Sequence, residues 1–299
     1  MPPKLVKRGL LPLSDGVVNY LFHTARTPAK TTALRQPSTP PIVLIGGTAQ
    51  TIHSLLGHHA PLANHSQHGL LQYELRGQGT TTTLPLSDCS LQQHVADFER
   101  VIQSHPEFTN DAGQVDLCGF SFGGRVALAI AAELPHRVRK IVCTGVPANR
   151  GATGRIILKG WLESLSRGDL EAFLWQTMCD GHSERFLNRH ESRLKKWVQS
   201  AADANTAQAI ASLVGQTHTD DVTSPWHTVS LARKAAEGGL LPEDGLFLVG
   251  DQDRIAPPEQ CLVLSEEGGW ECVVVQGAGH SVPIEQPILW REAVMGHLV

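Results

Sequence analysis

The chain has 299 residues, of which 41% are hydrophobic and only 18% are charged. This balance supports a buried core and excludes an intrinsically disordered protein. The formal net charge of −4 gives no electrostatic attraction to nucleic acid or to an anionic membrane, so we expect neither partner.

The six cysteines contain no C-x-x-C pair, which argues against a disulfide framework and against a metal site. The apolar stretch at the N-terminus is interrupted by Lys7 and Arg8 and is too short for a signal-peptide core. No window approaches about 18 uncharged apolar residues, so no membrane span is predicted. We expect a cytoplasmic protein without a metal or a cofactor.

Short apolar runs alternate with helical patterns in the first part of the chain. Val17–Phe22 and Leu70–Leu75 are predicted strands, and Ile42–Ile45 is an unbroken apolar run typical of buried parallel strands. The tract Thr80–Thr83 is polar, and we expect a loop there. Leu91–Ser104 has apolar residues at helical spacing and is predicted to be an amphipathic helix.

The next three predicted elements are a strand, a helix and a strand. They cover Val115–Cys118, Phe122–Leu134 and Arg139–Thr144, and Pro135 ends the helix. This order predicts βαβ units and therefore a parallel sheet.

A helical block interrupts this alternation from about residue 147 to residue 226. Its predicted helices are Gly154–Leu165, Asp169–Met178, Arg185–Ala202 and Asn205–Val214. Strand patterns return at Leu246–Val249 and Cys272–Val275. We predict a core formed by residues 1–146 and 227–299, with a helical cap inserted at 147–226. Most aromatic side chains of this cap are expected to pack its helices, and one or two to line a pocket.

The segment Gly119-Phe120-Ser121-Phe122-Gly123 matches the pattern G-x-S-x-G and lies between a predicted strand and a predicted helix. A nucleophile in this position sits on a strained turn, which requires small residues two positions before and after it. The helix start also supplies free N–H groups and the positive end of a dipole. Ser121 is thus the predicted nucleophile; the alternative is an ordinary glycine-rich turn with an incidental serine.

A serine hydroxyl needs a neutral imidazole to accept its proton, and the imidazole needs an acceptor on its other nitrogen. His280 lies in a glycine-rich loop after the last predicted strand, and we predict that it is the base. Asp251 and Asp253 both follow the strand that ends at Val249. We favour Asp253 as the acid, and we expect Asp251 to bond its own turn backbone.

The run Gly46-Gly47-Thr48 follows the predicted strand Ile42–Ile45. Two backbone N–H groups commonly stabilise the oxyanion of acyl transfer, each worth about 3 kcal/mol. The predicted donors are Phe122 and Thr48, and Gly47 would let the backbone approach a substrate. The alternative is an ordinary turn.

Together these residues resemble the α/β-hydrolase superfamily over nearly the whole chain. Glu74–Gly79 resembles its D-x-R-G-x-G turn, with Glu in place of Asp, and His280–Pro287 resembles its G-H-x-x-x-x-E-x-P ending. Gly46 departs from the usual His-Gly pair. The resemblance implies an α/β fold with an eight-stranded, mostly parallel sheet and a helical cap. Serine at 121 excludes the haloalkane dehalogenases and epoxide hydrolases of this fold, which use Asp.

The stretch Gly119–Leu128 is also similar to the elbow of the SHCHC synthases, lyases of menaquinone biosynthesis. In those enzymes an arginine four residues after the serine helps to hold an acidic substrate. That resemblance gives Arg125 a substrate-binding role; the alternative is an ion pair on the protein surface.

The leading hypothesis is a serine hydrolase that cleaves a small carboxylic ester, lactone or thioester through an acyl-enzyme on Ser121. The first alternative keeps the same triad but makes the protein a C–C bond hydrolase or an SHCHC-synthase-like lyase. The second alternative is a non-enzymatic module that binds a ligand. The expected partner is a small-molecule substrate, and the sequence does not indicate an oligomeric state.

Overall fold

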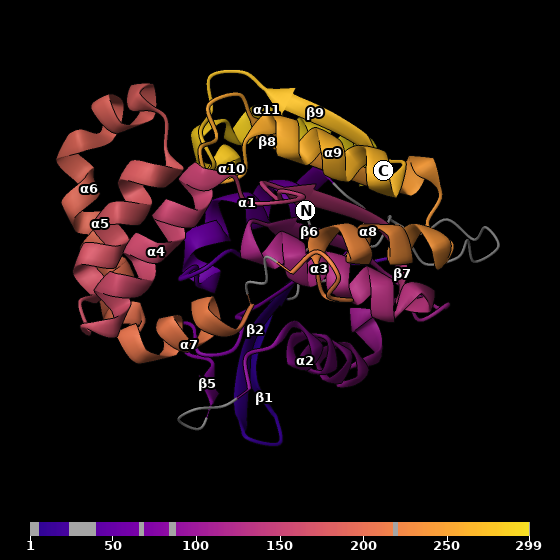
Figure 1. Ribbon diagram of the computed structural model, residues 1–299. Coiled ribbons are helices and arrows are strands. Elements are labelled where there is room, and N and C mark those ends of the chain that lie inside the picture. Colours follow the sequence, from indigo (N-terminus) through magenta and orange to yellow (C-terminus); the bar gives the residue numbers. More distant parts are fainter. Residues whose placement is uncertain (1–5, 24–39, 66–68, 84–87, 218–220, 299) are drawn as a thin grey trace.

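The computed structural model describes residues 6–23, 40–65, 69–83, 88–217 and 221–298. These residues form a central β-sheet with helices on both of its faces (Figure 1). A group of helices lies to one side of the sheet, on the left in Figure 1.

The sheet has nine strands. They are β1 (Val6–Pro12), β2 (Gly16–His23), β3 (Ile42–Ile45), β4 (Leu70–Tyr73), β5 (Thr82–Thr83), β6 (Val115–Phe120), β7 (Val138–Thr144), β8 (Gly245–Gly250) and β9 (Glu271–Val275). Eight of them lie in the order β1-β2-β4-β3-β6-β7-β8-β9, and β5 pairs with β2. All pairings of β2 are antiparallel and the others are parallel. The predicted α/β class and mostly parallel sheet are confirmed.

The described helices are α1 (Ile52–His65), α2 (Leu91–Gln103), α3 (Phe122–Glu133), α4 (Ala152–Ser166), α5 (Leu170–Gly181), α6 (Glu184–Ala204), α7 (Ala207–Thr217), α8 (Thr228–Glu237), α9 (Pro258–Gly268), α10 (Val282–Glu285) and α11 (Pro287–Leu298). Helices α2, α3 and α8 share one buried apolar cluster with the sheet. Helices α1 and α11 share another cluster with its opposite face. The sheet is therefore covered on both sides, as buried parallel strands require.

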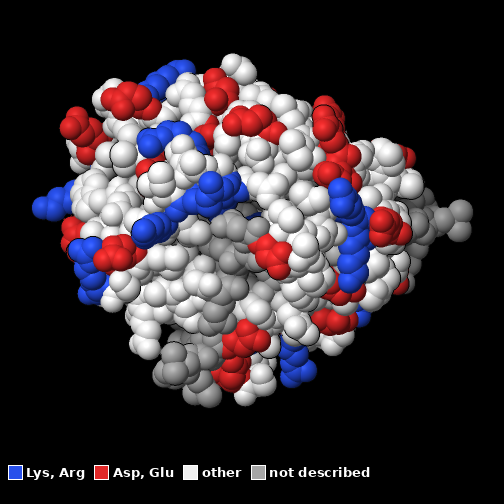
Figure 2. Space-filling model, viewed as in Figure 1, with Lys and Arg blue, Asp and Glu red and all other residues white. Residues whose placement is uncertain are grey.

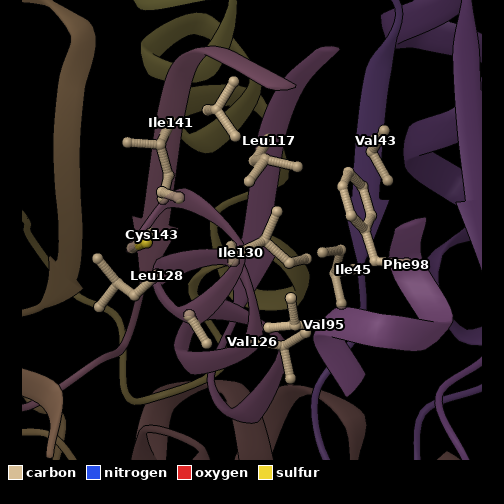
Figure 3. Close-up of a cluster of buried hydrophobic side chains, with 14 of the residues drawn as sticks. Val43, Ile45, Val95, Phe98, Leu117, Val126, Leu128, Ile130, Ile141 and Cys143 are labelled. Atoms are coloured by element: carbon tan, nitrogen blue, oxygen red, sulfur yellow. The ribbon is translucent and has the colours of Figure 1, made fainter. Parts of the chain in front are cut away.

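Side chains of β3 alternate between the two clusters, because successive strand residues point to opposite faces of the sheet. In β3, Val43 and Ile45 belong to the α2–α3 side, whereas Ile42 and Leu44 belong to the α1–α11 side. Figure 3 shows side chains of β3, β6 and β7 pointing toward apolar residues of α3. Because successive strand residues point to opposite faces, an unbroken apolar run such as β3 fits only a strand buried on both sides.

Helices α4, α5, α6 and α7, which we call the α4–α7 group, follow β7 in the chain and precede α8 and β8. Most of their buried apolar residues lie in one cluster, which also includes Ala49 and contains Phe173, Leu174, Val198, Ile210 and Val214. Leu213 of α7 belongs instead to the cluster that α2, α3 and α8 share with the sheet. The helical patterns of residues 147–226 are confirmed as helices, while the division of the chain into a core and a cap stays a prediction.

Two strands differ from the sequence prediction. Strand β1 was not predicted, because residues 6–12 show no continuous apolar face. It is the first strand in the order and pairs with β2 alone. Thr82–Thr83 was expected to lie in a loop, but these residues pair with Gly16 and Val17 of β2. A two-residue strand of polar residues leaves no periodic signal.

The face of the molecule shown in Figure 2 has no strong preference for charge of one sign. Figure 2 shows basic and acidic side chains interspersed over one face, without a large area of a single sign. None of the helices in the described ranges is long and apolar enough to cross a membrane.

Candidate active site

The predicted site residues follow neighbouring parallel strands of the sheet. Gly46–Thr48 follow β3, Ser121 follows β6, Asp253 follows β8 and His280 follows β9. Since β3, β6, β7, β8 and β9 pair in parallel, their carboxyl ends lie at the same edge. This is the edge at which ligands of open α/β sheets bind.

Ser121 occupies a sharp turn between β6 and α3. Its φ is +53° and its ψ −119°, a strained combination for a residue with a side chain. The turn is held by the Ser121 N–H, which donates to the carbonyl oxygen of Thr144 at 2.7 Å. A Cβ on Gly119 would lie 2.4 Å from the Gly123 oxygen, and one on Gly123 2.4 Å from the Gly46 oxygen. Both glycines of the motif are therefore required by close backbone approach.

A hydrogen-bonded chain connects the three predicted catalytic side chains. His280 Nε2 lies 2.8 Å from Ser121 Oγ, and His280 Nδ1 lies 2.7 Å from Asp253 Oδ2. A carboxylate only accepts, so the ring proton lies on Nδ1 and Nε2 can accept the serine proton. His280 is 5% exposed and Asp253 3% exposed, which keeps both contacts away from bulk water.

The two aspartates of the loop after β8 have different partners. Asp253 Oδ1 accepts hydrogen bonds from the N–H groups of Ile255 and Ala256, at 2.9 and 2.8 Å. These bonds orient the carboxylate so that its other oxygen meets His280. Asp251 Oδ1 instead accepts from the N–H of Ala278, in the loop after β9, at 3.1 Å; the expectation that it bonds its own turn is wrong. The structure thus places Asp253, and not Asp251, at the imidazole.

Gly145 is a site residue that the sequence did not reveal. It follows β7 with φ at +67°, and its N–H donates to the Leu248 carbonyl at 2.8 Å. A Cβ here would lie 2.9 Å from Cε1 and 3.1 Å from Nδ1 of His280. The imidazole therefore rests on a position that only glycine fills without strain. Glycine carries no functional group, so no chemical signal pointed to it.

Ser121 and His280 line a small cavity of about 40 Å³. The predicted oxyanion donors Thr48 and Phe122 line the same cavity. Gly47 lies one residue earlier, where its Cα packs beside Ser121 and its N–H donates to Gln50 Oε1 at 2.8 Å. The side chain of Gln50 was not recognised from the sequence as a partner of this loop.

Two arginines line this cavity, Arg125 from α3 and Arg150 from the segment before α4. Both also line an adjoining recess with Asn149 and His227. Arg125 is only 4% exposed, so its guanidinium group does not lie on the protein surface. Arg150 is partly buried, and the substrate-binding role of Arg125 stays a prediction.

The α4–α7 group closes the cavity from outside the sheet. Ile157, Leu158 and Trp161 of α4 line it. Trp161 also packs edge-on against Phe173 of α5, with ring centroids 5.6 Å apart. As expected, one tryptophan lines the pocket while Phe186 and Trp197 stack on each other within the helices.

Comparison with known proteins supplies the family. The family described as "Alpha/beta hydrolase family" matches residues 42–293, which is most of the chain and includes every site residue named above. The chain belongs to this family. The α/β hydrolase described here thus has the α/β fold and the mostly parallel sheet that the resemblance implied, with the turn at Ser121 between β6 and α3.

Individual relatives of this α/β hydrolase are distant. It is 25% identical to "Proline iminopeptidase PfmaB" of Pestalotiopsis fici over 249 residues, which cover 77% of this chain and 81% of that protein. The enol-lactonase of Burkholderia xenovorans LB400 has a similar structure, with a TM-score of 0.76, 18% identity and coverage of 97% and 99% of the two chains. The 2-hydroxy-6-oxo-6-phenylhexa-2,4-dienoate hydrolase of Rhodococcus sp. strain RHA1 gives a TM-score of 0.71, 19% identity and coverage of 99% of both chains.

Proposed function

We propose that this α/β hydrolase is a serine esterase that cleaves small carboxylic esters, with lactones and thioesters as close variants. The supporting observation is the hydrogen-bonded chain from Ser121 through His280 to Asp253 at the wall of a cavity. Each member has the partner that nucleophilic catalysis at neutral pH requires.

In the proposed reaction, Ser121 Oγ attacks the ester carbonyl carbon while His280 Nε2 takes the hydroxyl proton. The imidazolium then donates that proton to the leaving alcohol, and an acyl-enzyme remains on Ser121. Water attacks the acyl carbon, His280 accepts a proton from it, and the carboxylic acid leaves as Ser121 regains its hydrogen. Asp253 stabilises the imidazolium in both halves of the reaction.

The oxyanion of each tetrahedral intermediate would be held by the N–H groups of Phe122 and Thr48. Both residues line the cavity with Ser121, and Phe122 is the first residue of α3, where the helix dipole favours negative charge. Each donor is expected to contribute about 3 kcal/mol to stabilising the transition state.

Substrate access involves the α4–α7 group, which we propose acts as a cap. A cavity of about 40 Å³ has room for only a few water molecules, so its wall must move to admit an ester. A larger groove of about 320 Å³ lies on the other side of Ile157, between α4, α5 and Arg254. Displacement of the Ile157 side chain would join the two spaces.

The test combines turnover with active-site labelling. A series of p-nitrophenyl esters from acetate to decanoate, together with a lactone and a thioester, measures the activity. A fluorophosphonate probe followed by peptide mass spectrometry identifies the reactive residue, which we expect to be Ser121. An enzyme that neither turns over any of these substrates nor reacts with the probe is not a serine hydrolase, and the ligand-binding module becomes the better explanation.

A second candidate function is supported by the two arginines. Arg125 and Arg150 are the charged side chains among the described residues that line the cavity. Arg125 is buried and Arg150 is partly buried, and guanidinium groups at a cavity wall suit a substrate that carries a carboxylate. The Rhodococcus hydrolase with a similar structure is named for a dienoate, which is such a substrate. We therefore keep C–C bond hydrolysis, or a lyase reaction with the same triad, as the alternative for an anionic substrate.

Arg125→Ala distinguishes these two candidates. On p-nitrophenyl hemisuccinate, kcat/KM is expected to fall about 10- to 100-fold, because a charge-assisted hydrogen bond to the carboxylate is lost. On p-nitrophenyl butyrate, which is neutral and of similar length, it is expected to stay within about threefold. Arg167→Ala is the control, since Arg167 is exposed and paired with Glu163. Equal losses on both esters would remove the case for an anionic substrate.

Gly145→Ala tests the contact between the end of β7 and the imidazole. We expect kcat to fall about 10²-fold, the effect of moving a catalytic group by about 1 Å. The left-handed backbone adds a stability loss of about 1–2 kcal/mol. Gly168→Ala is the matched control, because Gly168 has φ at +77° and no atom within 4 Å of an added Cβ. Ester turnover and urea unfolding are measured for both, and equal kcat values would show that the contact with His280 is unimportant.

A further inference from the structure

The loop that carries His280 is held from two sides. On the sheet side, the Gln252 N–H donates to the Ala278 carbonyl at 2.9 Å. On the side of the α4–α7 group, the Ser281 N–H donates to the carbonyl of Gly181, the last residue of α5, at 2.9 Å. The loop of the proposed base His280 is thus hydrogen-bonded both to the loop after β8 and to the end of α5, in the proposed cap.

Glu285 joins these two parts with both of its carboxylate oxygens. Oε1 accepts a hydrogen bond from the N–H of Gly279, the residue before His280, at 3.0 Å. Oε2 accepts from the N–H of Ser183 at 3.1 Å and also from the Ser183 hydroxyl. Ser183 is the N-cap of α6. One side chain therefore connects the histidine loop to the turn between α5 and α6.

The packing around this bridge is close. A Cβ on Gly279 would lie 2.8 Å from the Ser183 nitrogen and 2.9 Å from the carbonyl carbon of His182. The α5–α6 turn thus lies directly against the residue before the imidazole. A shift of this turn would displace either Gly279 or the carboxylate that bonds it.

We infer that Glu285 is a positioning residue. Through its hydrogen bonds, the position of the α5–α6 turn determines how His280 is placed opposite Ser121. This inference rests on the proposed function, since it assigns a role within the same site. Glu285 is not among the described residues that line the cavity, so its direct contact with the histidine loop is the hydrogen bond to the backbone of Gly279.

A carboxylate is the group that this position requires. Glu285 faces two backbone N–H groups and one hydroxyl donor, and a carboxylate offers acceptors on both oxygens. A glutamine has one acceptor oxygen, and its NH₂ group would face a donor on one side of the bridge. Burial raises the pKa of the Glu285 carboxyl, while its hydrogen bonds to Ser183 and Gly279 act in the opposite direction.

The experiment compares Glu285→Gln, Ser183→Ala and the double variant with the wild type on p-nitrophenyl acetate. Glu285→Gln is expected to lower kcat about 10- to 100-fold with little change in KM, because the base is misplaced while the cavity is unaltered. Ser183→Ala keeps the backbone N–H bond to Glu285 but loses the hydroxyl donor and the N-cap acceptor of the Phe186 N–H, and its kcat should fall about two- to tenfold. The double variant should be no slower than Glu285→Gln alone, since both changes break the same bridge. Glu184→Gln is the control: Glu184 is exposed on the same turn and bonds only to Asn188 among the contacts described.

The outcomes separate this inference from the proposed function. The rate of Ser121 labelling by the fluorophosphonate, measured per folded molecule, reports the activation of the serine even if no ester is a substrate. An active wild type with unchanged kcat and labelling rate in Glu285→Gln overturns the inference and leaves the esterase proposal intact. A lowered melting temperature with unchanged kcat means a purely structural role, which also overturns it. If Glu285→Gln does not fold, an unchanged kcat in Ser183→Ala is decisive against the coupling.

Discussion

Replacing Ser121 with alanine is expected to lower kcat for ester hydrolysis by about 10⁶-fold, the effect of removing a serine nucleophile from such a triad. Without Oγ no acyl-enzyme forms, and only the donors around the cavity remain to stabilise an attacking water. KM should change little, because alanine removes one oxygen and leaves the cavity walls in place. Steady-state assays with p-nitrophenyl acetate measure the decrease in kcat.

The control for this prediction is Ser166→Ala. Ser166 is exposed at the end of α4, and its hydroxyl donates to the Glu163 carbonyl. Its removal should leave kcat unchanged. If Ser121→Ala retained more than about a hundredth of the wild-type kcat, the acyl-enzyme mechanism would be wrong, and direct attack by water on the substrate would have to replace it.

Asp253→Asn is expected to lower kcat by about 10⁴-fold while leaving the fold intact. An asparagine has one acceptor oxygen, but two N–H groups compete for one side of this carboxylate and His280 for the other. If the amide oxygen accepts from the two N–H groups, the NH₂ group faces His280 and favours the imidazole tautomer with its proton on Nε2, which cannot accept the proton of Ser121. The opposite orientation is disfavoured, because it turns the NH₂ group toward the N–H groups of Ile255 and Ala256. The effect should appear in kcat, measured with the same ester.

Asp251→Asn provides the matched comparison in the same loop. Asp251 accepts a single hydrogen bond on Oδ1, from the N–H of Ala278, and an amide oxygen can accept the same bond. Its kcat should stay within about threefold of the wild type. A larger loss in Asp251→Asn than in Asp253→Asn would reverse the assignment of the acid.

The central strands and the elbow could be predicted because their signals are local. The apolar run Ile42–Ile45 is β3 as predicted, since a strand buried on both faces must be apolar at every position. The requirement for small residues at Gly119 and Gly123 was predicted correctly, since a Cβ added at either position would lie 2.4 Å from a backbone oxygen. The order of Ser121, Asp253 and His280 along the chain then predicted which residues the sheet edge brings together.

Other parts of the site depend on contacts between distant segments and leave no local pattern. Glu285 was visible as part of the ending that resembles the family, but its partner Ser183 lies 102 residues away on another helix. Gly145 contributes only the absence of a side chain beneath the imidazole. Helix α1 was not predicted as an element, because Pro61 inside it breaks the usual signal. These contacts join segments that are distant in the sequence, so they become visible only in the folded structure.

The separate apolar cluster of the α4–α7 group has an evolutionary consequence. Substitutions that reshape the part of the cavity wall formed by α4 can be absorbed largely within these four helices, because most of their buried apolar side chains pack on one another. Leu213 of α7 packs instead in the apolar cluster of the sheet. Selection can therefore alter which molecules fit without rebuilding the reacting groups. The turn at Ser183 marks the boundary of that freedom, for a change there reaches the histidine.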